Sequence, residues 1–282
     1  REVMIKNQKI FNSEVLNDIG LLKKIAKNNN YSLDSLKTLL SENFVIPKDL
    51  RSKLLVQGSA IVMNPKSGDI LAMVGGRTEE NYIDHYNRAV QSKRQPGSVF
   101  KPFIYLSALE NGAKPCTQLI NQPLVFFIDD TTRWNPQNHD GSTGLLTSLR
   151  DGLKRSLNLI SVRIVQELIS PIDVKNTAEK FNFTTPIKAV DAIALGVSEV
   201  KLIDITTAYS AIANNGILNE PIMIKSIYDN DGRNLINFQS ESKEVADEKT
   251  IFILRDMMKS VIDNGTGASL RWKYKFYTPT AG

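Results

Sequence analysis

The sequence predicts an α+β protein in which an antiparallel sheet packs against helices. Two apolar runs, AIVM and ILAMV, flank the turn Pro65-Lys66-Ser67-Gly68-Asp69, a pattern typical of a β-hairpin. A second hairpin is predicted around Asn230-Asp231-Gly232. Strand-like segments therefore lie toward both ends of the chain with helical patterns between them, which favours one sheet covered by helices.

The length and composition are those of a globular protein. The chain has 282 residues, enough for one large domain or two small ones. Its 35 Lys and Arg against 30 Asp and Glu give a net charge of +5, spread along the chain, so no nucleic-acid partner is expected. No apolar run approaches the ~18 residues of a membrane helix, and no signal-peptide pattern is present.

Cysteine and histidine point to no further chemistry. The single cysteine, Cys116, excludes a disulfide within the chain and is expected to be a small buried side chain. His85 and His139 have no Cys, His or carboxylate at ligand spacing. Neither a metal nor a cofactor is therefore expected.

The chain is predicted to divide near residue 53. Residues 1–52 are polar, with short helical patterns, and are expected to form a linker or small helical subdomain that follows a missing N-terminal region. Residues 53–282 are expected to form the main domain. Its helices are predicted at residues 98–111, 146–155, 157–169, 173–181, 201–216 and 246–265. A last strand is predicted in WKYKFYTPTAG, residues 272–282.

Three Ser-x-x-Lys patterns occur, and only one has a chemically informative context. Ser240–Lys243 lies in a charged run and is expected in an exposed loop, and Ser198–Lys201 spans a predicted helix start, where serine caps helices. Ser98–Lys101 instead opens a strongly apolar helix introduced by Pro96-Gly97. It is the candidate nucleophile–base pair.

This placement has a chemical rationale. Residues three apart share a helix face, so Lys101 is expected to reach the Ser98 hydroxyl. The helix N-terminus favours developing negative charge, and burial lowers a lysine pKa so that the amine can act as a base. Lowering that pKa from about 10.4 to near 7 would cost about 4–5 kcal/mol. When a Ser-x-x-Lys pattern stands alone in a sequence, the ordinary alternative to catalysis is a serine that caps the helix and a lysine whose amine reaches solvent.

The residues around this pair resemble a known family. RQPGSVFKPFIYLSALENG, residues 94–112, is similar to the nucleophile helix of penicillin-binding transpeptidases, specifically the bifunctional class A peptidoglycan synthases. The resemblance extends from about residue 54 to residue 282. In the family's order it includes AIVMNPKSGDILAMVGG, NRAVQSKRQPGS, WNPQN, TSLRDGLKRSLNLISVRI, ALGVSEVKLIDITTAYSAIANNG and DNGTG. It implies the β-lactamase/transpeptidase-like fold, with an antiparallel sheet between helices and an all-helical subdomain.

The resemblance also assigns roles to individual residues. Ser156-Leu157-Asn158 matches the family's second motif, which implies that Ser156 relays a proton and that Asn158 orients Lys101 or the substrate amide. Standing alone, Ser-x-Asn between helices is usually a cap. Gly97, Trp134 and Asn138 are expected to bind substrate. For Trp134 and Asn138, a packed loop is an equal alternative.

The family's third motif, Lys-Thr-Gly, does not occur in this sequence. Gly265-Thr266-Gly267 matches the turn that precedes it in the family, and the sequence given ends at Ala281-Gly282, one residue before the expected lysine. The resemblance implies that the following strand binds the substrate carboxylate and supplies one oxyanion N–H, the other coming from Ser98. The chain is therefore expected to be truncated before this motif and weak or inactive by itself.

The function implied by the resemblance is a D,D-transpeptidase. Ser98 would be acylated by D-Ala-D-Ala stem peptides of peptidoglycan, an amine of a neighbouring stem would resolve the acyl-enzyme, and β-lactams would trap it. Expected partners are stem peptides, glycan strands and β-lactams. The parent is expected to be membrane-anchored with a glycosyltransferase domain, on the extracytoplasmic, periplasmic face of a bacterial inner membrane. Two alternatives remain: a serine β-lactamase or D,D-carboxypeptidase, and a non-catalytic β-lactam-sensing or scaffold module.

Overall fold

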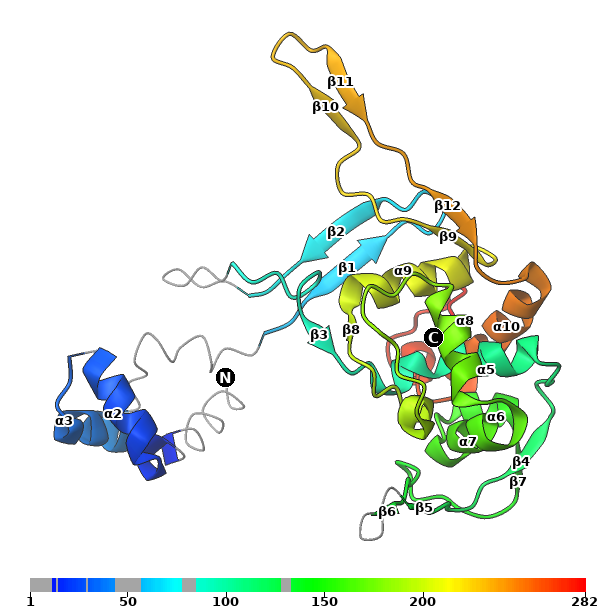
Figure 1. Ribbon diagram of the computed structural model, residues 1–282, viewed down its shortest axis with the longest axis horizontal. Coiled ribbons are helices and arrows are strands. Elements are labelled where there is room, and N and C mark those ends of the chain that lie inside the picture. The colour runs from blue at the N-terminus through cyan, green and yellow to red at the C-terminus, as the bar shows by residue number, and fades with distance from the viewer. Residues whose placement is uncertain (1–11, 14, 29, 44–56, 78–84, 128–132) are drawn as a thin grey trace. The chain divides into compact units, whose positions relative to one another are not determined.

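The computed structural model describes residues 12–13, 15–28, 30–43, 57–77, 85–127 and 133–282 (Figure 1). The chain divides into two compact units, one of residues 1–59 and 74–88 and one of residues 60–73 and 89–282. None of the helices in the described ranges is both long and apolar enough to cross a membrane.

The described residues between 12 and 43 of the first unit are mainly helical. It contains α2 (Ile19–Asn28), α3 (Leu33–Thr38) and the π-helical turn η1 (Leu39–Asn43). The Ser32 side chain caps α3 by accepting a hydrogen bond from the Ser35 N–H. These elements enclose a small core of Val15, Leu22, Ile25, Ala26, Leu36 and Leu40. The predicted domain boundary near residue 53 lies outside the described residues and stays a prediction.

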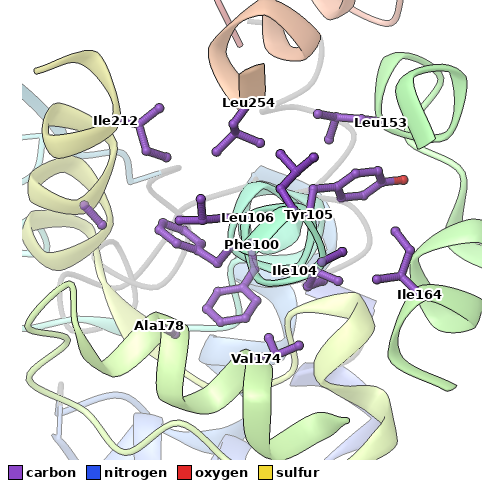
Figure 2. Packing of buried hydrophobic residues seen from close by; sticks show 14 of the residues in the cluster. Phe100, Ile104, Tyr105, Leu106, Leu153, Ile164, Val174, Ala178, Ile212 and Leu254 are labelled. Carbon is purple, nitrogen blue, oxygen red and sulfur yellow. The ribbon is translucent and has the colours of Figure 1, made fainter. Parts of the chain in front are cut away.

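Helix α5 (Lys101–Glu110) is the centre of the second unit. It continues a single 3₁₀ turn, η2 (Gly97–Phe100), so the predicted helix over residues 98–111 is present with a tighter first turn. All residues from Lys101 to Leu109 are buried, as expected for a helix that is apolar on every side. Figure 2 shows side chains of neighbouring helices around it, among them Leu153, Val174, Ile212 and Leu254.

The remaining predicted helices are confirmed, with bounds that differ by one to three residues. They are α6 (Leu149–Lys154), α7 (Asn158–Arg163) with the π-helical η3 (Ile164–Leu168), α8 (Pro171–Glu179), α9 (Leu202–Ala213) and α10 (Glu248–Asn264). The structure adds the 3₁₀ turn η4 (Asp191–Leu195) and α11 (Ser269–Trp272). Side-chain caps start three of them: Ser148 on α6, Ser170 on α8 and Asp247 on α10.

Each sheet among the described residues has two strands. The pairs are β1 (Ala60–Met63) with β2 (Ile70–Val74), β3 (Lys93–Arg94) with β8 (Val200–Lys201), β4 (Gln118–Ile120) with β7 (Leu146–Ser148), β5 (Phe126–Phe127) with β6 (Arg133–Trp134), β9 (Ile217–Asn219) with β12 (Ser242–Glu244), and β10 (Ser226–Tyr228) with β11 (Asn234–Asn237). Both predicted hairpins, β1–β2 and β10–β11, are confirmed (Figure 1). The predicted single sheet is not present within the described ranges.

The predicted strand over residues 272–282 is wrong. Lys275 has a positive φ of 54°, which an extended strand does not allow. The Arg271 guanidinium donates to the carbonyls of Phe276 (2.7 Å) and Thr278 (3.0 Å) and pairs with Asp263, so these carbonyls bond a side chain instead of a strand. This segment therefore adds no strand to the β1–β2 hairpin.

The prediction for Cys116 is also wrong, because its side chain is exposed. The Thr117 N–H donates to the Lys114 carbonyl at 2.9 Å, which makes residues 114–117 a tight turn. A side chain at the third position of a surface turn points toward solvent. The turn geometry thus overrides the general tendency of cysteine to be buried.

Candidate active site

Two glycines fix the turn that carries Ser98. Gly97 has a φ of 58° and Gly196 a φ of 67°, both in the left-handed region. The Gly97 N–H donates to the Gly196 carbonyl at 3.3 Å, and a Cβ at position 196 would lie 2.2 Å from the Gly97 carbonyl oxygen. Position 196 therefore requires glycine for this close approach, and the half-buried Gly97 sets the start of η2.

Ser98 is exposed and its polar groups are available for chemistry. Among the described residues, neither its hydroxyl nor its backbone N–H makes a hydrogen bond. An N–H at the start of a helix has no partner within the helix and can receive a developing negative charge. The hydroxyl and the N–H thus meet the geometric needs of a nucleophile with one oxyanion donor.

Lys101 follows Ser98 by one 3₁₀ turn, in which side chains three apart lie above one another. The structure contains no direct hydrogen bond between the Ser98 hydroxyl and the Lys101 amine. Tyr209 supports the turn, because its hydroxyl donates to the Val99 carbonyl at 2.8 Å. Both side chains are therefore carried on one short, well-anchored segment.

The Lys101 amine joins the two sequence motifs. The residue is 1% exposed, and Nζ donates to Ser156 O at 2.6 Å, Ser156 Oγ at 3.1 Å and Asn158 Oδ1 at 2.9 Å. Of the four residues expected to be catalytic, the structure thus joins three directly, across more than 50 residues of sequence. The fourth, Ser98, lies three residues from Lys101 on the same segment.

Burial lowers the pKa of Lys101 from 10.5 to about 8. The three oxygen acceptors favour the ammonium form, but removal from water favours the neutral amine, and removal from water is the larger effect. Lowering the pKa by this amount costs about 3 kcal/mol, which is less than the cost of about 4–5 kcal/mol expected for a pKa near 7. With a pKa of about 8, roughly a tenth of the lysine is neutral at pH 7, compared with about one part in 3,000 for an ordinary lysine.

A strained turn presents Ser156 and Asn158. Ser156 ends α6 with a φ of 54°, a conformation that costs a residue with a Cβ about 1–2 kcal/mol. Its N–H bonds to Leu153 O at 2.9 Å, and the next N–H, of Leu157, bonds to Gly152 O at 2.8 Å. This arrangement closes α6 in the manner of a left-handed cap, and α7 begins at Asn158. Strain of this kind is typical of functional turns.

The other expected substrate-binding residues lie in a packed loop. Trp134 stacks on Phe126 with ring centroids 4.9 Å apart, and it packs against the core. Asn138 is only 6% exposed, and its side chain bonds to protein groups. The packed-loop alternative describes both residues, and their contact with substrate stays a prediction.

The two other Ser-x-x-Lys serines have structural roles that differ from those predicted. Ser198 is not the cap of α9, whose N-cap is Lys201; it is 3% exposed and accepts a hydrogen bond from the Lys188 N–H at 3.0 Å. Ser240 is half-buried and donates to the Glu220 carbonyl at 2.8 Å. Lys201, the partner of Ser198, is half-buried, and Lys243, the partner of Ser240, is exposed. Neither pair therefore offers a buried amine.

Replacing Ser198 by alanine is expected to lower stability without affecting acylation. The change removes the acceptor of the Lys188 N–H, and loss of this part-buried hydrogen bond costs about 0.5–1.5 kcal/mol. Denaturant unfolding measures this loss, and intact-mass analysis after incubation with penicillin measures labelling per folded protein. Ser240→Ala, with a cost below about 1 kcal/mol, is the matched control. A folded but unlabelled Ser198→Ala protein would move the nucleophile assignment away from Ser98.

Three groups of the site are not evident from sequence reasoning. The Gly196 carbonyl, the Tyr209 hydroxyl and the Gln137 carbonyl all shape it, the last by accepting a hydrogen bond from Asn158 Nδ2 at 2.8 Å. Gly196 carries a local signal, since it ends η4 in the left-handed position that glycine favours. The other two act through backbone carbonyls distant in sequence and carry no such signal.

The family model and the similar proteins agree on one family. A family model described as "Penicillin binding protein transpeptidase domain" matches residues 58–281. Penicillin-binding protein 1A of Rickettsia typhi is 32% identical over 274 residues, covering 85% of this chain and 34% of that protein. Penicillin-binding protein 1A of Neisseria meningitidis is 32% identical over 220 residues, covering 75% and 27%. The chain thus spans about a third of the length of these relatives.

Solved structures show the same fold. The crystal structure of penicillin-binding protein 1A from Haemophilus influenzae has a TM-score of 0.72 and 26% identity, covering 77% of this chain and 38% of that one. Penicillin-binding protein A of M. tuberculosis, solved as an imipenem acyl-enzyme complex, has a TM-score of 0.65 at 18% identity, covering 73% and 57%. The second likeness is evidence of fold alone. Both confirm the predicted transpeptidase-like fold class.

Proposed function

This chain belongs to the family of penicillin-binding protein transpeptidase domains, and from that premise we propose that it is the acyl-transfer domain of a peptidoglycan synthase with Ser98 as its nucleophile. One observation carries the proposal. Lys101, buried and held by Ser156 and Asn158, stands one turn after a serine whose hydroxyl and N–H are both unused by the described residues.

Acylation begins with the Ser98 hydroxyl and the neutral Lys101 amine. Ser98 Oγ attacks the carbonyl carbon of the penultimate D-alanine of a stem peptide, and its proton passes to Lys101 Nζ. The carbonyl π electrons move to oxygen, and the Ser98 N–H donates to this oxyanion. When the intermediate collapses, the C–N bond breaks and the departing D-alanine amine takes a proton from Lys101 through Ser156 Oγ, which lies 3.1 Å from Nζ. Lys101 is then neutral again.

Deacylation repeats these transfers with another nucleophile. An amine of a neighbouring stem peptide attacks the ester carbonyl, gives up a proton to Lys101, and forms the new amide bond. The Ser98–acyl bond breaks, and the proton returns to Ser98 Oγ. A β-lactam acylates Ser98 by opening its ring, so its leaving group stays attached to the acyl chain and hinders the second nucleophile. We therefore include covalent inhibition by β-lactams in the proposal.

The rest of the parent protein is a further part of the proposal. The relatives are about three times the length spanned by this chain, which leaves room for a glycosyltransferase domain and a membrane anchor. Stem peptides of peptidoglycan are cross-linked outside the cytoplasm. We accordingly place the parent at the extracytoplasmic, periplasmic face of a bacterial inner membrane.

The proposed function is tested by the fate of the acyl group. The full-length gene product is incubated with a D-Ala-D-Ala pentapeptide donor and an amine acceptor, and released D-alanine and cross-linked product are both measured. Equal amounts are expected. D-alanine without cross-linked product would favour a carboxypeptidase, and a penicilloyl-enzyme that decays in seconds instead of hours would favour a β-lactamase. A protein that releases no D-alanine would fit the sensing or scaffold alternative.

A chain that carries a Lys-Thr-Gly strand after Gly282 is expected to acylate faster than the chain as given. A cavity of about 600 Å³ lies between β1, α9, α10 and the C-terminal residues, lined by groups that include Met63, Tyr209, Met258 and Ala281. Tyr209 connects it to the Ser98 turn through the Val99 carbonyl. A strand there would bring the second oxyanion donor, worth on the order of 10²- to 10³-fold in rate.

The measurement is the second-order rate constant for penicillin acylation of both chains under one set of conditions. Thermal unfolding of each chain separates a loss of folded protein from a loss of rate. Equal rates per folded molecule would mean that no catalytic strand follows Gly282, and the placement of the third motif would be wrong.

A further inference from the structure

Asn138 is anchored against the start of α7 and uses its whole amide group there. Its Nδ2 donates to Asn121 Oδ1 and to the Ser142 carbonyl, each at 2.7 Å, and its Oδ1 accepts from the Leu159 N–H at 3.0 Å. Both amide protons are thus used, and the side chain is 6% exposed. This arrangement favours a role inside the protein over direct contact with substrate.

The residue before Asn138 faces the second motif. The Gln137 carbonyl accepts from Asn158 Nδ2 at 2.8 Å, while Asn158 Oδ1 accepts from Lys101 Nζ at 2.9 Å. The opposite orientation of the Asn158 amide would set its oxygen against a carbonyl and its NH₂ against the lysine amine. The Gln137 carbonyl therefore determines which end of the Asn158 amide faces Lys101.

Asn138 and Gln137 are linked by one peptide bond, which is planar. The Asn138 side chain is bonded to Leu159, and the Gln137 carbonyl is bonded to Asn158, the neighbour of Leu159. A second attachment supports the same loop, because the Arg155 guanidinium donates to Asp140 Oδ2 at 2.8 Å and to Ser142 Oγ at 3.0 Å. The loop is thus joined to the Ser156–Asn158 turn from both sides.

We propose that Asn138 is a positioning residue for acylation: by holding residues 137–142 against α7 it keeps the Gln137 carbonyl in place, and so keeps Asn158 Oδ1 directed at Lys101. This inference rests on the proposed function, in which Lys101 is the base. Asn138 acts only through Asn158, and this dependence makes its effect distinguishable from a general loss of stability.

The test is a double-mutant cycle in the full-length gene product. Asn138→Ala, Asn158→Ala and the double variant are mixed rapidly with penicillin, and the dissociation constant and the acylation rate constant are measured separately. Asn138→Ala is expected to lower the acylation rate constant by about 10- to 100-fold, because small misplacements of reacting groups have effects of this size. The dissociation constant should change less than about threefold. In the Asn158→Ala background, Asn138→Ala should have almost no further effect on this rate constant.

Two further variants keep the test decisive. Asn219→Ala is the matched control: Asn219 is 3% exposed and donates to the Pro65 carbonyl at 2.9 Å, with no bond to the Lys101 group. It should lower stability and leave the acylation rate constant of the folded fraction unchanged. If Asn138→Ala does not fold, Asn121→Ala removes one acceptor of the Asn138 amide and should show a weaker effect with the same dependence on Asn158.

The outcomes separate this inference from the proposed function. An unchanged acylation rate in Asn138→Ala, or an equal slowing in the Asn158→Ala background, would overturn the positioning role alone. Acylation that survives Ser98→Ala would instead overturn the proposed function.

Discussion

Replacement of Ser98 by alanine is expected to abolish covalent labelling by penicillin and to lower the rate of D-alanine release by about 10⁶-fold, the scale of losing a serine nucleophile. Ser98 is exposed and its hydroxyl has no hydrogen-bond partner among the described residues, so the folded state should lose less than about 0.5 kcal/mol. Intact-mass analysis and denaturant unfolding measure the two effects independently. Ser198→Ala is the control with the opposite pattern, less stable but fully labelled.

Replacement of Lys101 by methionine is expected to slow acylation by about 10²- to 10⁴-fold, the usual contribution of a positioned general base. Methionine keeps most of the volume of the buried side chain while removing the amine. In the unaltered protein the acylation rate should rise with pH and level off above about 8, where the Lys101 amine becomes mostly neutral. A rate that does not change between pH 6 and pH 9 would contradict the role of the neutral amine.

The same substitution has a stability signature whose sign follows from the Lys101 pKa. This pKa is about 8 in the folded state and near 10.5 in the unfolded state, so between these values the unfolded chain binds more protons. The free energy of unfolding contributed by this group therefore rises with pH, by about 3 kcal/mol from pH 8 to pH 10.5, and is constant below pH 8. Lys101→Met should lack this rise. Lys180→Met, at an exposed lysine that contacts Glu110 of α5, should retain it.

Local sequence patterns predict most of the helices and the central chemistry of the site. The Pro-Gly before Ser98, the apolar residues that follow it, and the turn signals of both hairpins each depend on a few neighbouring residues, and all are present in the structure. The pairing of Lys101 with Ser156 and Asn158 was accessible through family resemblance, because the two motifs recur in a fixed order.

The remaining features depend on contacts that no local pattern encodes. The close approach of Gly97 and Gly196 joins backbones 99 residues apart, and the Gln137 carbonyl accepts a hydrogen bond from an Asn158 side chain 21 residues away. The sequence predicts a C-terminal strand over residues 272–282. A strand needs a neighbour for its hydrogen bonds, whereas these carbonyls bond to Arg271.

The magnitude of the Lys101 pKa shift could not be predicted for a similar reason. Sequence position indicates burial, but the balance between desolvation and three oxygen acceptors is set by atoms from the Ser156–Asn158 turn. Removal of the amine from water lowers the pKa of Lys101 to about 8, a smaller shift than the expected value near 7 requires. At pH 7 the Lys101 amine is therefore neutral in only a minority of the molecules.

Peptide mapping of the penicillin-labelled full-length protein identifies the residue that becomes acylated. We expect one penicilloyl group per folded molecule, located by tandem mass spectrometry on Ser98. A penicilloyl group on Ser156, Ser198 or any other residue, with Ser98 unmodified, would contradict this expectation.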